Sequence, residues 1–219
     1  MRIILTDYLD VVSSWCFWSE PTWAELKRRY EGRVVFEWKI ALMDQKGLPT
    51  SREQEAWFYR RSGMMMRSPF MLSTAWYDPS LREWLPPNCV AEAAKDFENT
   101  DDRVRLALAY AALREGKKVA EWEVAAQIGA DAGKIDKKKL LDRAKSPVIE
   151  TRVRVSTAEF HALQVTQRPT FVIDTEIGDR AVFSGIVRPE PLVAALDSVL
   201  DDAAAYVTHA AHFGAPPAS

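Results

Sequence analysis

The sequence predicts an α/β fold in which a large all-helical segment is inserted into a smaller domain of strands and helices. Strand, helix and strand patterns follow one another within residues 3–40. The strand pattern then stops over residues 51–146, and a hairpin pattern with a final helix comes after it. We therefore expect a discontinuous α/β domain formed by 1–50 and 147–203, a helical insertion domain at 51–146, and a C-terminal tail at 204–219.

The first predicted strand covers residues 3–9, where β-branched and apolar side chains follow one another. Ser13 or Ser14 can then cap a helix that reaches about Tyr30, because a serine hydroxyl accepts hydrogen bonds from the unpaired N–H groups of a helix start. A second strand is predicted over 34–40. A strand, helix and strand of this length form a parallel pair with a right-handed crossover.

The middle of the chain contains a series of helical patterns separated by turn residues. The expected helices cover 52–66, 88–98, 101–115, 119–129 and 136–144. The stretch from Gly129 through Gly133 to Lys134 is interpreted as a helix break. It is not a phosphate-binding loop, because it is one residue too short and lacks the Ser or Thr that follows the lysine there.

The C-terminal part returns to the α/β pattern. The expected elements are a helix at 147–163, a hairpin of strands at 170–174 and 181–183, and a final helix at 189–202. The residues that follow are small and end in prolines, so we expect this tail to fray.

The composition is that of a soluble globular protein, with 47% hydrophobic and 27% charged residues. A net charge of −2 favours neither nucleic acid nor an anionic membrane as a partner. Asp7 interrupts the N-terminal apolar run before a signal peptide or membrane span could form, so we expect a cytoplasmic protein. In that reducing compartment Cys16 and Cys89 should form no structural disulfide, and Cys89 should pack at a helix start. No metal is expected, because the histidines lack ligand spacing: His161, His209 and His212.

One candidate site lies where the first predicted strand runs into the first helix. A helix N-terminus presents unpaired N–H groups and a partial positive charge, which stabilise a thiolate or another anion. In a helix that starts with C-x-x-C, the first position is exposed and reactive, and the last is shielded one turn inside. Here the exposed position is Ser13 and the shielded one is Cys16, with Ser14 and Trp15 between them.

A second candidate feature is a proline immediately before a strand, in the segment Gln167-Arg168-Pro169-Thr170-Phe171. Proline removes a ladder donor and permits a cis bond, so we expect Pro169 to be cis and to border the site. The binding candidates are Pro169 with its neighbours Arg168 and Thr170, together with Ser14 and Trp15. Arg168 is interpreted either as a holder of a substrate carboxylate or as a solvated arginine. Aromatic side chains of the helical segment either form core or wall a pocket over the helix terminus: Trp57, Phe58, Phe70, Trp76, Tyr77 and Trp84.

These residues carry a resemblance to a known family. One stretch resembles the D-x-V-C-P-W-C-Y segment of the FrnE-type branch of DsbA-like proteins, with serine in place of the first cysteine and the proline: Asp10-Val11-Val12-Ser13-Ser14-Trp15-Cys16-Phe17. Residues 166–174 resemble the G-V-P-T-F-V-I-D cis-proline segment of that family, and the helix starts at Pro87-Asn88-Cys89 and at Ser146-Pro147 also match. The likeness covers nearly the whole chain. It implies a thioredoxin fold with a large helical insertion, and a protein that does not work as an ordinary dithiol oxidoreductase.

A serine at the first position is also similar to what kappa-class glutathione transferases and 2-hydroxychromene-2-carboxylate isomerases carry. That resemblance implies that the Ser13 hydroxyl donates a hydrogen bond to the thiolate of bound glutathione, which lowers the pKa of the thiol. Those families hold the glutamyl end of glutathione with a Ser-Asp pair after the last strand. Here the corresponding stretch, Phe183-Ser184-Gly185-Ile186-Val187-Arg188, contains no aspartate.

Three hypotheses about function follow. The leading one is an enzyme that uses a small thiol such as glutathione to transfer, isomerise or reduce a small hydrophobic electrophile, with Ser13 and Cys16 as catalytic candidates. The alternative is a redox-inactive thioredoxin-fold binding module that holds a peptide beside Pro169. A third is an oxidoreductase that uses Cys16 alone. The plainer interpretations are that Ser13 only caps the helix and that Cys16 is a small buried apolar residue. The oligomeric state stays open, and a homodimer is allowed.

Overall fold

The computed structural model describes residues 1–43, 48–81 and 83–214. Its strands form one mixed sheet in the order β2-β1-β3-β4. The strands are β1 (Ile3–Leu9), β2 (Val35–Ile40), β3 (Thr170–Thr175) and β4 (Arg180–Ser184). β1 runs parallel to β2 and antiparallel to β3, and β3 and β4 form an antiparallel hairpin. The predicted parallel unit and the predicted hairpin are therefore confirmed, and the arrangement is a thioredoxin fold.

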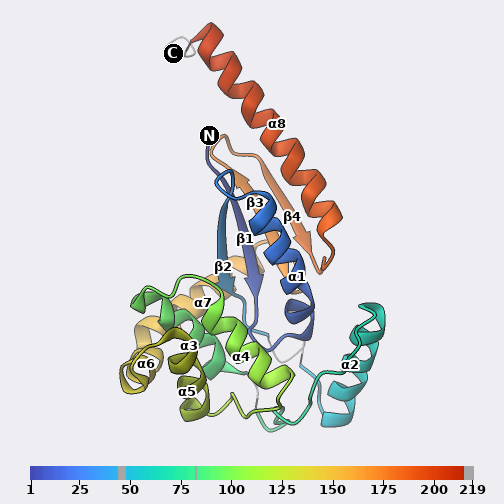
Figure 1. The fold of residues 1–219 in the computed structure, drawn as a ribbon, viewed down its shortest axis with the longest axis vertical. Helices are drawn as coiled ribbons and strands as arrows, with labels where there is room; N and C mark the ends of the chain where they lie inside the picture. The colour runs from blue at the N-terminus through green and yellow to red at the C-terminus, as the bar shows by residue number, and fades with distance from the viewer. Residues whose placement is uncertain (44–47, 82, 215–219) are drawn as a thin grey trace.

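Helices cover both faces of this sheet (Figure 1). They are α1 (Ser14–Arg29), α7 (Pro147–Ala162) and α8 (Pro189–Phe213). On one face Leu5 packs with Trp23 of α1 and Leu196 of α8. On the other face Tyr8 packs with Phe160 of α7. Successive side chains of a strand point to opposite faces, so the apolar run of β1 supplies core residues to both layers.

The predicted helical segment lies at one end of the sheet, below the first turn of α1 in Figure 1. Its helices are α2 (Arg52–Met65), α3 (Leu85–Ala94), a short 3-10 turn (Lys95–Phe97), α4 (Arg103–Leu113), α5 (Trp122–Gly133) and α6 (Lys137–Ala144). A continuous apolar core joins Leu9 and Cys16 to Val90 of α3 and Leu108 of α4. The helical segment therefore shares a core with the sheet, while α2 stands to one side of the other helices.

The expected helix break at Gly129 to Gly133 is wrong, because both glycines lie inside α5. A Cβ atom added to Gly129 would lie 2.5 Å from Cγ1 of Val90 and 3.2 Å from Cδ2 of Leu140. The absence of a side chain therefore lets α5 approach α3 and α6 closely. Turn-forming residues and close-packing residues look the same in a single sequence.

The end of the last helix also differs from the prediction. α8 continues to Phe213, so the expected fraying from residue 203 is wrong over the described part of the tail. Alanines favour a helix even where no core is available, and this segment contains many of them. The helix projects beyond the sheet (Figure 1), and its last apolar side chains are exposed: Tyr206, Val207 and Phe213.

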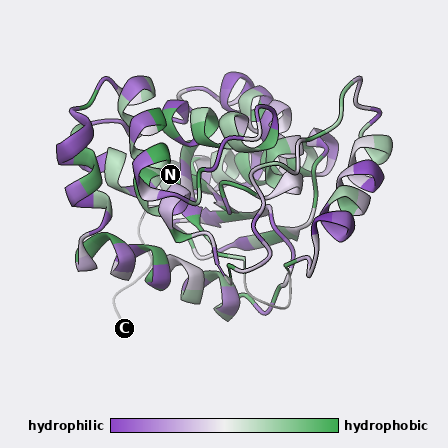
Figure 2. Ribbon diagram, turned by 90° about the horizontal axis from the view of Figure 1, so that it is seen from below, coloured by the Kyte–Doolittle hydropathy of each residue, from purple (hydrophilic) through white to green (hydrophobic). Residues whose placement is uncertain are grey.

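Green hydrophobic and purple hydrophilic stretches alternate along the helices in Figure 2, which is the pattern of amphipathic helices packed on a core. Within the described residues, no helix combines the length and the apolar character that a membrane crossing requires.

Candidate functional site

The turn after β1 delivers Ser13 to the start of α1. Ser13 has an extended backbone, and its Oγ accepts a hydrogen bond of 3.4 Å from the backbone N–H of Cys16. The buried carboxylate of Asp10 fixes the same turn, because it accepts hydrogen bonds of 3.0 Å from the backbone N–H groups of Val12 and Met43. Ser13 is therefore the N-cap of α1, one of the two positions that the sequence allowed.

Cys16 lies in the core and does not line an opening. It is 3% exposed and packs in the cluster that contains Leu9 and Trp38. Burial raises the pKa of the Cys16 thiol well above its ordinary value, and the Asp7 carboxyl raises it further, whereas a hydrogen bond with the Ser13 hydroxyl lowers it less. A thiol reacts as its thiolate. The structure therefore favours the interpretation of Cys16 as a packed apolar residue over a nucleophile.

Asp7 is a buried acid that the sequence analysis used only as evidence against a signal peptide. It is 1% exposed, its Oδ1 has no hydrogen-bond partner among the described residues, and burial raises the pKa of its carboxyl well above the usual range. Arg105 of α4 lowers that pKa and is itself ion-paired with Glu20 and Asp102. An acidic residue inside an apolar strand was the sequence signal that could have identified Asp7 as a buried acid. Its effect at the site is to oppose ionisation of Cys16.

A cleft of about 240 Å³ opens at the N-terminus of α1. Four of the predicted site residues lie together in its lining: Ser13, Ser14, Trp15 and Arg168. Residues of α2 form the opposite wall. The indole N–H of Trp18 on α1 donates a hydrogen bond of 3.1 Å to Oγ of Ser62, and this bond holds α2 beside α1. The structure thus brings the helix start, the segment before β3 and the helical insertion to one opening.

Some of the predicted aromatic residues wall this cleft and others do not. Phe58, Trp76, Tyr77 and Trp84 line it. Phe70 instead stacks on Trp18, with ring centroids 5.4 Å apart. Trp57 lies outside the lining on α2, with 51% of its surface exposed. The aromatic residues that the sequence singled out therefore divide into two groups, one that walls the cleft and one that lies outside it.

Arg168 has partners that neither sequence interpretation anticipated. Its guanidinium donates hydrogen bonds to the backbone carbonyls of Ala41 and Leu42 and lies 4.3 Å from the centre of the Phe160 ring. These contacts tie the segment before β3 to the segment after β2. The Arg168–Pro169 peptide bond is cis, whereas Pro169 itself, which was expected to border the site, is not among the residues that line the cleft.

Thr170 lies behind the cleft. Its side chain is fully buried, and its hydroxyl bonds to the carbonyl of Gln167 at 2.6 Å and to Ser184 Oγ at 3.1 Å. The backbone N–H of Gly185 donates to the carbonyl of Pro169 at 2.8 Å. Both Thr170 and the Ser184-Gly185 segment therefore shape the proline turn from behind, and Gln167 carries the turn to the cleft wall.

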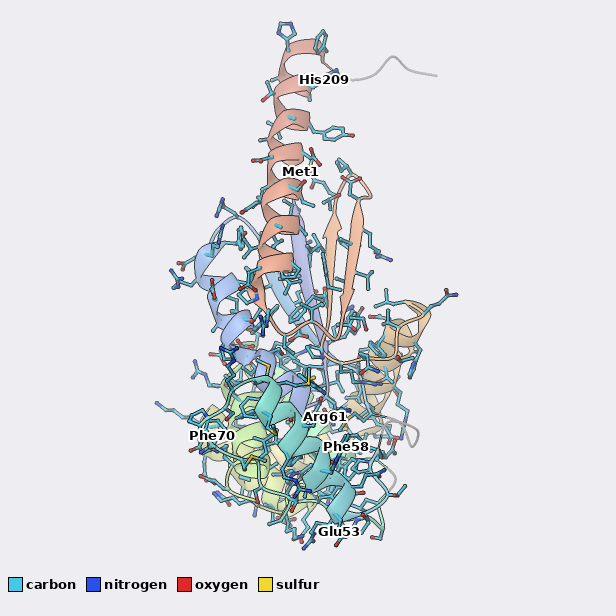
Figure 3. The ribbon with its side chains drawn as sticks, turned by 90° about the vertical axis from the view of Figure 1, so that its right-hand side faces the viewer. Met1, Glu53, Phe58, Arg61, Phe70 and His209 are labelled. Atoms are coloured by element: carbon cyan, nitrogen blue, oxygen red, sulfur yellow. The ribbon has the colours of Figure 1, made fainter. Side chains whose placement is uncertain are left out.

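Two charged residues in the lining were not identified from sequence, Glu55 and Arg61 on α2. Burial raises the pKa of the Glu55 carboxyl to about 7. The Arg61 guanidinium lies 5.1 Å from the ring centres of Trp57 and Phe58, and Figure 3 shows Glu53, Phe58 and Arg61 following one another along α2. Within the described ranges, no three His, Cys, Asp or Glu side chains gather in a way that could hold a metal ion.

Solved structures with this fold include disulfide-exchange proteins. A Nitrosomonas europaea protein matches with a TM-score of 0.77 at 17% identity, over 92% of this chain and 99% of that one. The cytosolic disulfide reductase DsbM from Pseudomonas aeruginosa matches with a TM-score of 0.73 at 18% identity, over 90% and 98% of the two chains. A structure of DsbM with GSH matches with a TM-score of 0.70 at 17% identity, over 90% and 99%.

At these identities the structural matches establish the fold alone. No curated protein matches the sequence. The profile of the DSBA-like thioredoxin domain, however, matches residues 4–197, which include all of the strands except the first residue of β1 and the start of every helix described above. The chain therefore belongs to the DSBA-like thioredoxin domain family.

Proposed function

We propose that this protein binds glutathione in the cleft and uses the Ser13 hydroxyl to stabilise the thiolate of that ligand. The bound thiolate then acts on a small hydrophobic electrophile, by transfer, isomerisation or reduction. The observation that carries this proposal is the position of Ser13, which caps α1 and at the same time lines an open cleft with aromatic walls.

The hydroxyl of Ser13 can serve the helix and the ligand together. A serine hydroxyl has one donor and two acceptor sites. Its oxygen accepts from the Cys16 N–H, and its proton, which also acts on the Cys16 thiol, would turn toward an anion that binds in the cleft. A hydrogen bond to a charged group contributes about 1.5–3 kcal/mol, and each pKa unit corresponds to about 1.4 kcal/mol. Together with the partial positive charge of the helix start, this would lower the pKa of a bound thiol by one to two units, to roughly neutral pH.

The walls of the cleft suit a hydrophobic second substrate. Phe58, Trp76 and Trp84 supply aromatic surface next to Trp15 on the first turn of α1. An apolar molecule gains free energy by leaving water for such a surface. An electrophile seated there would lie near the thiolate that Ser13 holds, which is the arrangement that thiol addition requires.

Two properties of the structural neighbours support the proposal. One DsbM structure contains GSH, and the DsbM protein is described as cytosolic. We propose a cytoplasmic location for this chain on the same basis, since that compartment contains glutathione and keeps thiols reduced.

Isothermal titration calorimetry tests the proposal directly. We expect saturable binding of reduced glutathione, weakened about tenfold or more by Ser13→Ala because a hydrogen bond to a charged group is lost. The matched control is Ser146→Ala, which removes the serine cap of α7 away from the cleft. No binding at millimolar glutathione, or equal effects of the two substitutions, would overturn the proposal.

A second candidate function has one observation in its favour. The burial of Cys16 leaves the site without a reactive thiol, as a redox-inactive binding module would require. Such a module would give no turnover with any thiol and would keep its partner after Cys16→Ala. Turnover that depends on Ser13 would exclude it.

A further inference from the structure

We infer that Glu55 binds the ammonium group of the thiol ligand and so selects thiols that carry a primary amine near one end. This inference rests on the proposed function, because it names how the same cleft recognises glutathione. Four features of the structure support it: where Glu55 lies, what orients it, which charges surround it, and what it can still accept.

Glu55 lies in the first turn of α2 and faces the cleft although its surroundings are largely apolar. The residue is 7% exposed, and it lines the same opening as Ser13. Burying an ionised carboxylate is costly unless it is paired and hydrogen-bonded. A glutamine at this position would avoid the cost of burying a charge. The presence of a glutamate therefore indicates that the charge is used.

A chain of hydrogen bonds orients this carboxyl group. The indole N–H of Trp76 donates to the Tyr59 hydroxyl at 3.1 Å, and the Tyr59 hydroxyl in turn lowers the pKa of the Glu55 carboxyl. Tyr59 is 2% exposed and Trp76 is 1% exposed, so both rings are fixed by packing. A ligand group therefore meets a carboxylate that is already held in place, which lowers the entropic cost of binding.

Glu55 has no cationic partner in the part of the chain that the structure describes. No lysine, arginine or histidine there forms an ion pair with it, and the pKa of its carboxyl is raised by burial with only the Tyr59 hydrogen bond opposing. A carboxylate offers about four acceptor positions, of which Tyr59 occupies one. The others remain for the N–H groups of a bound ammonium.

Glutathione has the charges that this cleft complements. It carries one ammonium group at its glutamyl end, a thiol in the middle, and a carboxylate at each end. Ser13 on α1 would meet the thiol and Glu55 on α2 the ammonium, while Arg61 on the rim adds positive charge toward a carboxylate. The two recognition residues come from different elements, so a ligand that contacts both must span the cleft.

The test compares glutathione with an analogue in which only the ammonium is replaced by hydrogen, glutaryl-cysteinyl-glycine. Both are titrated by calorimetry into the wild type, Glu55→Gln and Glu53→Gln at pH 8. Glu53 lies on the same helix, is exposed, and does not line the cleft, so it is the matched control. We expect the wild type and Glu53→Gln to prefer glutathione by about tenfold or more, because the analogue leaves the buried Glu55 carboxylate without its charged partner. Glu55→Gln should bind both ligands equally.

The outcomes separate this inference from the proposed function. If glutathione binds, Ser13→Ala weakens it, and Glu55→Gln keeps the full preference, the inference fails and the proposed function stands. If the wild type binds neither ligand, the proposed function fails and the inference fails with it. Glutamine has the size of glutamate and can still interact with Tyr59, so Glu55→Gln should fold normally. Unchanged near-ultraviolet circular dichroism would show this, and a lost preference for glutathione over the analogue could then not be due to unfolding.

Discussion

The backbone N–H of Cys16 donates a hydrogen bond of 3.4 Å to Oγ of Ser13, and the Ser13 hydroxyl also acts on the Cys16 thiol, whose pKa it lowers. Ser13 lines the cleft, whereas Cys16 packs in the core behind it. Ser13 was expected to be exposed, but it is only 6% exposed. The position that carries the reactive thiol in a C-x-x-C helix therefore holds a largely buried serine, and the remaining thiol lies in the core. One substitution and one labelling experiment test this division of roles.

Ser13→Cys should create a reactive thiol and a reducible disulfide with Cys16. The introduced thiol would sit at the helix N-terminus, where its pKa is expected below the ordinary value of about 8.5. Oxidised glutathione should then remove two hydrogens from the protein, as measured by mass spectrometry. Ser146→Cys is the control, because it places a thiol at the N-cap of α7 without a cysteine one turn away. A Ser13→Cys protein that forms only mixed disulfides would show that the first turn is not shaped for exchange.

Alkylation of the native wild type should be slow and strongly dependent on pH. Burial raises the pKa of the Cys16 thiol far above the assay range and that of the Cys89 thiol to about 12. The thiolate fraction, and hence the rate with iodoacetamide, should rise about tenfold per pH unit between pH 6 and 9. Peptide mapping separates the two sites. A rate at Cys16 that does not change over this range would support an oxidoreductase that uses Cys16 alone.

Local sequence signals were enough to predict the helix start and the order of elements. Ser13 caps α1 through a contact only three residues away, and the parallel and antiparallel pairs follow from the spacing of short apolar runs. The same local signals were enough to predict that Ser14 and Trp15 lie at the site, because both belong to the first turn of α1.

Residues whose role depends on distant contacts could not be identified in this way. Glu55 is one of several charges on α2, and only the folded structure shows that it is buried in the lining of the cleft. Arg168 was noticed, but its partners Ala41 and Leu42 lie more than a hundred residues away. Gly129 was interpreted as a break because its contacts with α3 and α6 are not visible in sequence.

Gly129→Ala should destabilise the protein although alanine favours helices. The new methyl group would meet Val90 at 2.5 Å, and overpacking of this kind costs about 1–3 kcal/mol, more than the gain of about 1 kcal/mol in helix propensity. Gly63→Ala is the matched control, since a Cβ in that helical glycine would lie 3.6 Å from its nearest neighbour, the Met71 sulfur. We expect urea unfolding to give a lower free energy of unfolding for Gly129→Ala and an equal or higher one for Gly63→Ala. Equal effects would show that α5 can move away from α3.

Glu55→Gln should make the protein more stable at alkaline pH and leave it nearly unchanged in acid. The other charged side chains in the cleft lining are Arg61 and Arg168, and the hydroxyl that faces Glu55 is that of Tyr59. Burial raises the pKa of the Glu55 carboxyl to about 7, against about 4.3 in an unfolded chain. Between these values the folded state binds more protons than the unfolded state, so the wild type loses stability as the pH rises through this window.

The size of that loss follows from the difference in pKa. It approaches a limit on the order of 3 kcal/mol above pH 7 and vanishes below about pH 4. Glutamine has no such titration, so the difference in free energy of unfolding between Glu55→Gln and wild type should grow from pH 4 to pH 8 in urea titrations. Glu53→Gln should show no such growth, because Glu53 is exposed. Saturating glutathione should shrink the difference at pH 8, since a bound ammonium would stabilise the carboxylate that is otherwise costly to bury. A difference that stays constant with pH would mean that Glu55 is ionised in the native protein without penalty, and the argument for an ammonium partner would lose its basis.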